Sequence, residues 1–335
     1  MPEALNPGWY QLETSAVAWM RQFKLASDPA QDRRLASFAV GELGARILPR
    51  ATDLRLAQFA TDQIMWLCAF DDSFCDEGTY RRDPARMAFL VADMMRTAET
   101  GQPRTEHPVM VALADLRRRL NCDSSPVQRS RWVHALRAYL CYQVWEAGHR
   151  AHGTVPDLPA YLIARISNGA MPVCAAALDI AGGYEVPGPE MESPAIRALS
   201  EMCGETVGFD NDIISYWKEA LRADDGINLI DVLARTYRLP LGEALREAVA
   251  LRDRVLAQYL RLRDQVLPTV TEPTRCYIAD LDAWIRGNLD WGMASHRYLN
   301  PENPASLPTA PVAAAPTCTD TSPIPGITSW WNLPP

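Results

Sequence analysis

Several features that would point directly to a functional class are missing from the sequence. Positive charge is not in excess, because 33 Lys and Arg stand against 41 Asp and Glu and leave a formal net charge of −8. Nucleic-acid binding therefore has no electrostatic footprint. The eight cysteines form neither a CxxC pair nor a zinc-like set. In a chain of this length we expect reduced, mostly buried thiols, which favours the cytoplasm.

Long apolar runs are also missing. The longest, residues 64–70, is far too short to span a membrane. The first ten residues, MPEALNPGWY, contain no basic region followed by an apolar core, so no signal peptide is expected. A chain that is 48% hydrophobic and 22% charged has the composition of a soluble globular protein. We expect no membrane and no nucleic acid among its partners.

Strand-like alternation is nearly absent, and helical periodicity extends from about residue 10 to residue 298. Loops rich in Pro, Gly and Asp separate the candidate helices, at residues 101–108, 121–126, 152–159, 182–194 and 223–226. Ser125 and Ser193 each precede a proline, an arrangement typical of a capped helix start. The sequence therefore predicts one all-α domain over residues 1–300.

Residues 301–335 form a tail rich in Pro, Ala and Thr, without any period. Such a segment cannot bury enough apolar surface to order itself, so a disordered tail is expected. Trp330 and Trp331 are the exception, since two large apolar rings are candidates for docking on the body.

The last predicted helix carries one continuous face. Spacings of four and three residues join Tyr277, Leu281, Trp284, Asn288, Trp291, Ser295 and Tyr298. The apolar first half of this face is expected to pack in the core. Asn288 and Ser295 do not suit a core, so the second half is expected to line a cavity.

The stretch FDDSFCDEG, residues 70–78, places four acids in seven positions at the end of an apolar helix. Asp72 and Asp76 share one helix face, and Asp71 lies about 100° round from Asp72. These acids repel one another, and helix C-termini prefer cations, so a positive charge should offset them. Carboxylates without His or Cys suit Mg²⁺ before Zn²⁺. A solvated acidic helix end is the alternative.

The stretch NDIISYWKE, residues 211–219, places Asn211, Ser215 and Glu219 four residues apart, over an arc of about 80° and a rise of about 12 Å. All three side chains offer oxygen, and only one carries full charge. A Mg²⁺ ion held by an amide, a hydroxyl and a carboxylate keeps positions for water and phosphate oxygens. A polar, solvated helix face is the alternative.

Together these two stretches resemble the metal motifs of bacterial class I terpene synthases, or terpene cyclases. DDSFCD is similar to the longer DDxxxD form of their aspartate-rich motif. NDIISYWKE is similar to Asn-Asp-x-x-Ser-x-x-x-Glu with Lys before the Glu. Bacterial members also carry a diphosphate-sensing Arg 46 residues before the Asn, and 211 minus 46 is position 165, which is Arg165. Arg297–Tyr298 matches a pair near the end of their last helix.

The resemblance covers residues 6–300 and implies a single-domain helical bundle around a central active-site cavity. It implies that an isoprenyl diphosphate ionises with three Mg²⁺ ions. The implied metal ligands are Asp71, Asn211, Ser215 and Glu219, and the implied diphosphate donors are Arg165, Lys218, Arg297 and Tyr298. Gly169 would break a helix beside the cavity, Trp291 and Phe74 would face the carbocation, and Asp72 and Asp76 would support the metal ligands. Asn168 departs from the acid often found there, which puts in doubt how strongly Arg165 is coupled to the helix break.

The resemblance favours cyclisation of farnesyl diphosphate to a sesquiterpene hydrocarbon or alcohol. Cys68, Cys174, Ala176 and Gly169 would put small side chains where many relatives place aromatic ones, so geranylgeranyl diphosphate and a diterpene stay open. A chain-elongating prenyltransferase should show two aspartate-rich motifs, and this chain has one. A non-catalytic helical interaction protein would leave these matches to coincidence. A homodimer stays open.

Overall fold

A computed structural model describes residues 1–76, 78–222, 226–298, 313–317, 320 and 322–333; the side chains of residues 76 and 218–222 lie outside this description. Every regular element among these residues is a helix, so the predicted all-α class is confirmed. In the first 191 residues the elements are α1 (Trp9–Gln22), α2 (Pro29–Ala36), α3 (Val40–Ile47), α4 (Leu54–Phe70), the π-helical turn η1 (Asp71–Asp76), α5 (Pro84–Thr100), α6 (Pro108–Asp123), α7 (Pro126–His152), α8 (Leu158–Asn168), α9 (Met171–Ala181) and α10 (Gly188–Met191). The rest are α11 (Pro194–Arg222), α12 (Leu229–Tyr237), α13 (Leu241–Val266), α14 (Glu272–Ala294) and the 3₁₀ turn η3 (Thr328–Trp331).

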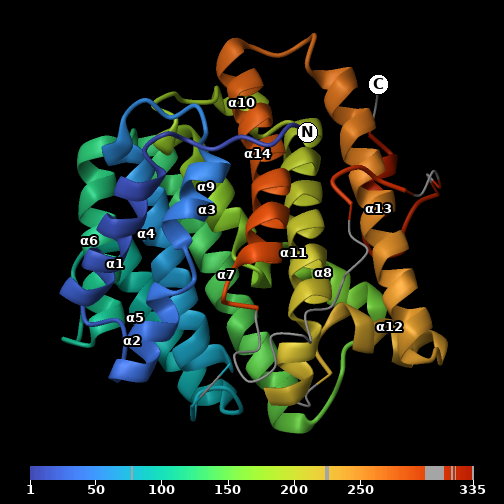
Figure 1. Cartoon of the computed structure of the whole chain (residues 1–335), viewed down its shortest axis with the longest axis horizontal. Coiled ribbons are helices and arrows are strands. Elements are labelled where there is room, and N and C mark those ends of the chain that lie inside the picture. Colours follow the sequence, from blue (N-terminus) through green and yellow to red (C-terminus); the bar gives the residue numbers. More distant parts are fainter. Residues whose placement is uncertain (77, 223–225, 299–312, 318–319, 321, 334–335) are drawn as a thin grey trace.

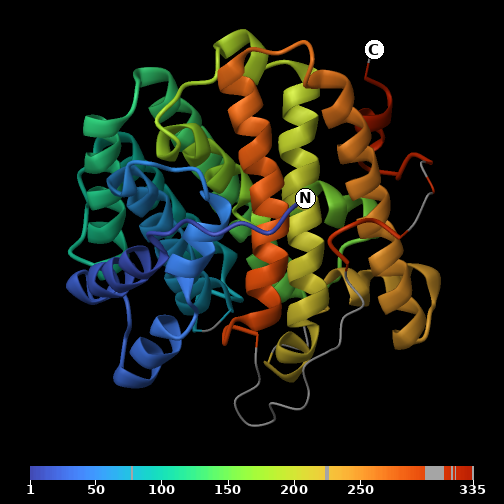
Figure 2. The ribbon, with the colours of Figure 1, turned by 45° about the horizontal axis from the view of Figure 1, so that its top comes forward.

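The long helices pack around a central space. α11 lies between α13 and α14, and the three run side by side in both ribbon views (Figures 1 and 2). α14 also packs on α3 and α9, while α4 packs on α1, α3, α6 and α9. α4, α9, α11 and α14 therefore form the walls of the interior, and both sequence motifs lie at the C-terminal ends of wall helices.

The predicted helix starts are confirmed. Ser125 caps α7, since its hydroxyl accepts a hydrogen bond from the backbone N–H of Gln128 and the Gln128 side chain accepts one from the backbone N–H of Ser125. Ser193 precedes α11, and its hydroxyl accepts a hydrogen bond from the N–H of Ile196 at 3.3 Å. Each cap accepts a hydrogen bond from a backbone N–H of the first helical turn, which has no partner within the helix. The proline at the next position has no backbone N–H and so needs no acceptor.

The predicted face of the last helix is buried as a core and cavity wall. Tyr277 and Leu281 are buried in the core. Asn288 lines the central cavity, as expected for the second half of the face, and Trp284 lines it as well. Ser295 is buried behind the cavity, where its hydroxyl donates to the carbonyl of Phe38 at 2.8 Å.

The expectation of a disordered tail is wrong for residues 322–333; residues 301–312 lie outside the described part of the chain. Ile324, Ile327 and Trp330 are each at most 2% exposed. The Trp330 indole N–H donates to a carboxylate oxygen of Glu201 on α11 at 2.8 Å. The Trp330 carbonyl accepts a hydrogen bond from Gln258 on α13 at 2.7 Å. Three apolar side chains thus supply the burial that the composition of the segment does not suggest.

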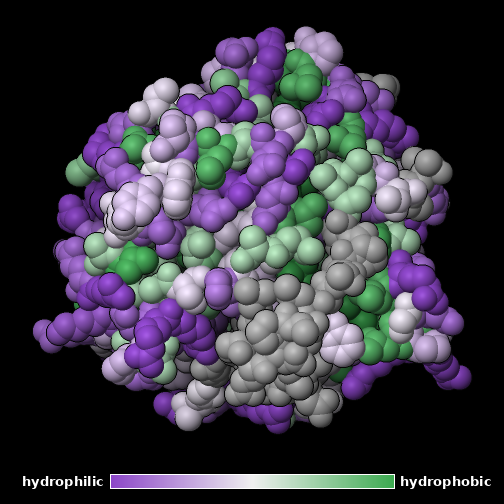
Figure 3. All heavy atoms as spheres, viewed as in Figure 1, coloured by the Kyte–Doolittle hydropathy of each residue, from purple (hydrophilic) through white to green (hydrophobic). Residues whose placement is uncertain are grey.

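Hydrophilic residues are spread over the face shown in Figure 3, with apolar ones in small groups between them. One helical stretch, Leu158–Ala181, has the length and apolar composition of a membrane span. It comprises α8 and α9 with the break between them, and 56% of its most apolar 18-residue stretch is buried inside the bundle. Core helices of globular proteins meet the same criterion, so this stretch is weak evidence for a membrane.

Candidate active site

A cavity of about 170 Å³ lies between the wall helices. Asp71, Arg165, Asn211, Arg297 and Tyr298 all line it, and the hydrogen bonds among them join them into one group, called the polar end below. Its lining comes from seven α-helices, the turn η1, the break between α8 and α9, and the segment after α14. It consists of Leu43, Ile64, Leu67, Cys68, Asp71, Tyr139, Arg165, Asn168, Gly169, Ala170, Met171, Cys174, Val207, Gly208, Asn211, Trp284, Asn288, Trp291, Arg297 and Tyr298. Of the small side chains expected here, Ala176 does not line it, because it lies on the other face of α9.

The acidic motif forms one side of the polar end. α4 passes directly into the π-helical turn η1, and Asp71, its first residue, lines the cavity. Arg297 donates to Asp71 at 3.1 Å and to Asp72 at 3.3 Å. Arg34 pairs with Asp72 at 3.2 Å, and the Asp72 side chain is only 1% exposed. The expected offsetting charge is therefore supplied by Arg297 and Arg34, and Asp72 lies behind the cavity wall.

The sequence does not identify Arg34 as a site residue, because it belongs to no motif and no local spacing distinguishes it. It lies on α2, and only the fold brings it to the end of α4. Burial opposes the charge of Arg297, yet Cys68, Asp72, Tyr298 and Asp71 together hold its pKa well above the ordinary value. Arg297 is thus a fixed cation at the polar end of the cavity.

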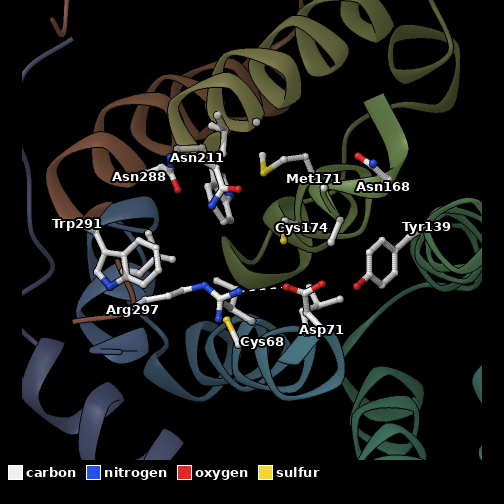
Figure 4. A pocket seen from close by; sticks show the side chains of 18 of the residues that line it. Cys68, Asp71, Tyr139, Asn168, Met171, Cys174, Asn211, Asn288, Trp291 and Arg297 are labelled. Atoms are coloured by element: carbon white, nitrogen blue, oxygen red, sulfur yellow. Dashed lines mark hydrogen bonds and ion pairs between the residues drawn. The ribbon is translucent and has the colours of Figure 1, made fainter. Parts of the chain in front are cut away.

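The second motif forms the opposite side. Asn211 lines the cavity, donates to the Tyr298 hydroxyl at 2.7 Å and accepts from Arg165 at 3.2 Å. Ser215 follows one turn later on the same helix and is 2% exposed. Lys218 and Glu219 continue the helix, but their side chains, like that of Asp76, lie outside the described residues. The structure therefore brings Asp71, Asn211, Arg165, Arg297 and Tyr298 into the lining of one cavity. Figure 4 labels Asp71, Asn211 and Arg297 among them.

Asp212, which the sequence left without a role, holds Arg165 in place. The Arg165 guanidinium donates to Asp212 at 2.7 Å and to the carbonyl of Gly208 at 2.9 Å. Tyr161 also donates to the Asp212 carboxylate. Burial raises the pKa of Asp212, and the charge of Arg165 and the hydrogen bond from Tyr161 oppose that shift. Since Asp212 is adjacent to Asn211, one turn of α11 both lines the cavity and orients the arginine.

Two glycines leave room for this arginine. A Cβ on Gly169 would lie 3.0 Å from Nη1 of Arg165, and a Cβ on Gly208 would lie 3.0 Å from its Nε. A glycine inside a helix such as α11 is a recognisable signal of close packing, although the partner is not visible in the sequence. Asn168 accepts a hydrogen bond from Arg165 through its amide oxygen at 3.3 Å. A neutral amide therefore contacts the arginine at the position where the bacterial enzymes often carry an acid.

The helix break lies next to Gly169, but Gly169 itself does not adopt the unusual conformation. α8 ends at Asn168 and α9 begins at Met171. Gly169 has φ −79°, whereas Ala170 is left-handed with φ 61°. A non-glycine residue there costs about 1–2 kcal/mol. The break is therefore held by the surrounding packing and not by glycine flexibility alone.

The two aromatic candidates are placed differently. Trp291 lines the cavity, and its indole N–H donates to the carbonyl of Phe38 at 2.7 Å, which fixes the ring. Phe74 is not among the lining residues; its ring packs against Phe70, Tyr80 and His107. Residues three apart share a face in an α-helix, but η1 is a wider π-helical turn, so Phe74 points away from the side of Asp71.

Tyr139 and Trp284 also bring aromatic rings to the cavity, and neither was singled out as a site residue. Tyr139 lies in the middle of the 27-residue helix α7, where no local pattern distinguishes a cavity-facing ring from a core ring. A largely apolar, aromatic-lined cavity with a few converging acids, amides and guanidinium groups is typical of a binding or active site for a small molecule.

Comparisons with known proteins agree with this description. The family "Terpene synthase family 2, C-terminal metal binding" matches residues 62–258. The chain is 35% identical to the (+)-(1(10)E,4E,6S,7R)-germacradien-6-ol synthase of Streptomyces pratensis, over 99% of this chain and 95% of that protein. It is 36% identical to the (+)-T-muurolol synthase ((2E,6E)-farnesyl diphosphate cyclizing) of Streptomyces clavuligerus, over 91% of this chain and 75% of that protein.

Solved structures show the same fold. The crystal structure of the SVS_A2 protein from ancestral sequence reconstruction has a TM-score of 0.88 and 31% identity, and covers 99% of this chain and 96% of its own. Wild-type cucumene synthase has a TM-score of 0.73 and 26% identity, over 88% of this chain and 99% of its own. The chain belongs to terpene synthase family 2, and the protein is therefore an enzyme, a terpene synthase.

Proposed function

We propose that this terpene synthase is a Mg²⁺-dependent cyclase that ionises farnesyl diphosphate, releases diphosphate, and cyclises the carbocation to a sesquiterpene hydrocarbon or alcohol. The observation that carries the proposal is the division of one cavity into a cationic, oxygen-rich end and an apolar, aromatic remainder. The similarity to a synthase named as farnesyl diphosphate cyclizing supports the C15 substrate. The reaction needs no nucleic acid or membrane, and the proposed location is the cytoplasm.

The polar end suits a departing diphosphate. Arg165 and Arg297 both line it, and Tyr298 adds a hydroxyl donor. Arginine presents a rigid fork of donors that matches oxyanions. Because the leaving group gains negative charge as it departs, donors fixed beforehand stabilise that charge without reorganising. Burial raises the pKa of Tyr298 to about 12, so its hydroxyl keeps its proton and stays a donor at neutral pH.

The residues present fit magnesium. Within the part of the chain that the structure describes, no three His, Cys, Asp or Glu side chains converge, so a zinc-like set is not found there. The oxygen ligands that line the cavity are instead the Asp71 carboxylate and the Asn211 amide, and the Ser215 hydroxyl is buried one turn further along α11. Hard cations prefer such a set of oxygens. We propose these three and Glu219 as the residues that hold Mg²⁺, with three ions in all. The ions would supply positive charge to the departing diphosphate.

The apolar remainder suits a carbocation. Trp291, Trp284 and Tyr139 supply aromatic rings to its lining, and a desolvated cation over the face of such a ring is stabilised by about 2 kcal/mol. We propose Trp291 as the main cation-stabilising ring, since its hydrogen bond to Phe38 fixes its orientation. Phe74 lies outside the cavity lining and is not part of this proposal.

Incubation of the protein with C10, C15 and C20 isoprenyl diphosphates and Mg²⁺, followed by gas chromatography, tests the function. Cyclic C15 products are expected. Longer diphosphates would instead show chain elongation, and no turnover of any substrate would show that the protein is not a working cyclase. The second candidate, a diterpene cyclase using geranylgeranyl diphosphate, is favoured by Cys68, Cys174 and Gly169 in the lining, since small side chains leave room.

Replacing Glu219 by glutamine tests the metal site. The amide keeps the size of the side chain and removes its charge, so turnover should fall at least about 100-fold, as when a transition-state charge loses a major partner. Helical content, measured by circular dichroism, should stay unchanged. Glu243→Gln, on the exposed first turn of α13, is the matched control and should keep wild-type turnover. Near-normal activity of Glu219→Gln would contradict the metal role.

A further inference from the structure

Asn288 is a polar side chain in the wall of the active-site cavity. It lies on α14 and is 7% exposed, and Figure 4 shows its side chain pointing into the cavity. Among the residues that the structure describes, its side-chain amide makes no hydrogen bond. A buried amide offers two donor hydrogens and an acceptor oxygen, and native proteins seldom leave such a group unsatisfied. We therefore expect its partner to be a molecule bound in the cavity.

The neighbours of Asn288 on the same helix face are aromatic. Trp284 lies one turn before it and Trp291 three residues after it, and both line the cavity. The Trp291 indole N–H is already used, because it donates to the carbonyl of Phe38 at 2.7 Å. The Trp284 indole N–H is buried and has no hydrogen-bond partner in the described part of the chain. This wall of the cavity therefore has more hydrogen-bonding capacity than the protein itself uses.

Water is the molecule that the Asn288 amide can bind beside an isoprenoid chain. The hydrocarbon chain of the substrate neither donates nor accepts a hydrogen bond. The diphosphate is expected at the polar end, and Asn288 makes no hydrogen bond to the five side chains there. One water needs about 15 Å³, a small part of the cavity volume of about 170 Å³. An ordered water therefore fits in this cavity.

Tyr139 also lines the cavity, and its hydroxyl makes no hydrogen bond to any described residue. Its surroundings differ from those of Asn288. Burial, and then the nearby charges of Cys75 and Asp71, raise the pKa of Tyr139 well above its ordinary value. A water on Tyr139 would thus lie near the acidic motif. A water on Asn288 would lie on the helix face of Trp291, the ring proposed to stabilise the carbocation.

We propose that Asn288 holds the water molecule that captures the final carbocation, so that the product is a sesquiterpene alcohol. This inference rests on the proposed function. The water donates a hydrogen bond to the amide oxygen of Asn288 and keeps a lone pair free on its own oxygen. That lone pair forms the C–O bond to the cationic carbon, and the resulting oxonium loses a proton to the diphosphate that ionisation has released. The amide is neutral and takes up no proton.

Asn288→Leu is the test, because leucine is close to asparagine in size and cannot hydrogen-bond a water. The enzyme is incubated with farnesyl diphosphate and Mg²⁺ in H₂¹⁸O, and products are analysed by gas chromatography with mass spectrometry. The wild-type product should be an alcohol with one ¹⁸O. In the variant the alcohol-to-hydrocarbon ratio should fall at least about tenfold, which corresponds to about 1.4 kcal/mol, the size of one hydrogen bond.

Asn121→Leu is the matched control, since Asn121 is exposed on α6, and it should keep the wild-type ratio and turnover. If Asn288→Leu does not fold, as judged by circular dichroism, Asn288→Ala serves in the same comparison. Tyr139→Phe keeps the ring and removes only the hydroxyl. A fall in the ratio for Tyr139→Phe but not for the Asn288 variant would place the water at Tyr139 and overturn the inference.

The other outcomes separate this inference from the function itself. A folded Asn288 variant that makes alcohol and hydrocarbon in the wild-type ratio would overturn the inference, whatever its total turnover. A wild-type product that is only hydrocarbon, or an alcohol without ¹⁸O, would also overturn it, while cyclic C15 products would still support the proposed function. No turnover of any isoprenyl diphosphate by the wild-type protein would overturn the proposed function, and this inference with it.

Discussion

Replacing Trp330 by alanine tests whether the C-terminal segment belongs to the folded domain. The indole is 2% exposed, packs with its neighbour Trp331, and donates to Glu201 at 2.8 Å. Truncating a buried tryptophan to alanine typically costs about 3–5 kcal/mol, through lost transfer free energy and the cavity left behind. Because Ile324 and Ile327 in the same segment are also buried, the segment has further anchors, and we expect a loss of about 3 kcal/mol in the free energy of unfolding.

Equilibrium unfolding in urea, followed by circular dichroism, measures this loss, and limited proteolysis reports whether the segment has detached. Trp9→Ala is the matched control: Trp9 is 40% exposed, and its replacement should change the unfolding free energy by less than about 1 kcal/mol. An equally small change for Trp330→Ala, with no new cleavage in residues 313–333, would refute the buried docking of the segment. Cleavage there with unchanged global stability would show that the segment detaches independently of the domain.

Two further predictions concern buried charges. The Asp210 carboxylate is 0% exposed and pairs with Arg252 at 2.8 Å in the wild-type protein, so Arg252→Leu leaves a buried charge without its partner. Urea unfolding should show that the free energy of unfolding falls by about 3–5 kcal/mol. Arg96→Leu, at an exposed position, is the control and should cause no such loss. Burial raises the pKa of Asp280 to about 6 from 3.8, so the folded state binds the extra proton and its stability falls as pH rises toward and through 6. Asp280→Asn should therefore reduce the fall in unfolding free energy between pH 4.5 and 7.5 by about 2 kcal/mol, and an unchanged pH profile would contradict the raised pKa.

The helical fold and the positions of the motif residues on their helices could be predicted because they depend on local spacing. Asn211 and Ser215 lie one turn apart on a helix whatever that helix packs against, and the sequence shows this interval directly. The acidic cluster likewise carries its own electrostatic signal, since it needs a positive partner wherever it lies. The sequence did not name Arg297 or Arg34 as those partners, because both reach the acidic cluster only through the fold.

The errors arose where the backbone departs from regular α-helix or where burial depends on distant partners. The π-helical turn after α4 moves Phe74 out of the cavity, and no residue in FDDSFCDEG predicts this wider turn. At the break beside Gly169 the left-handed residue is Ala170, although alanine disfavours that conformation. The surrounding packing, and not the intrinsic preference of the residue, sets the backbone conformation there. Average composition predicts a disordered tail, but in residues 322–333 Ile324, Ile327 and Trp330 are buried, and Trp330 bonds to α11 through its indole and to α13 through its carbonyl.

Three consecutive residues of α11 show how closely the candidate site and the packing of the fold are joined. Asp210 pairs with Arg252 on α13, Asn211 donates to Tyr298 after α14, and Asp212 pairs with Arg165 on α8. Successive residues of a helix point about 100° apart, so these three contacts fix α11 against neighbours in three directions. Arg252 also donates to the carbonyl of Ala313 at 2.9 Å, which ties the C-terminal segment to the same turn. A change at Asp210 or Asp212 should therefore alter the orientation of Asn211 and Arg165 without removing any group from the cavity.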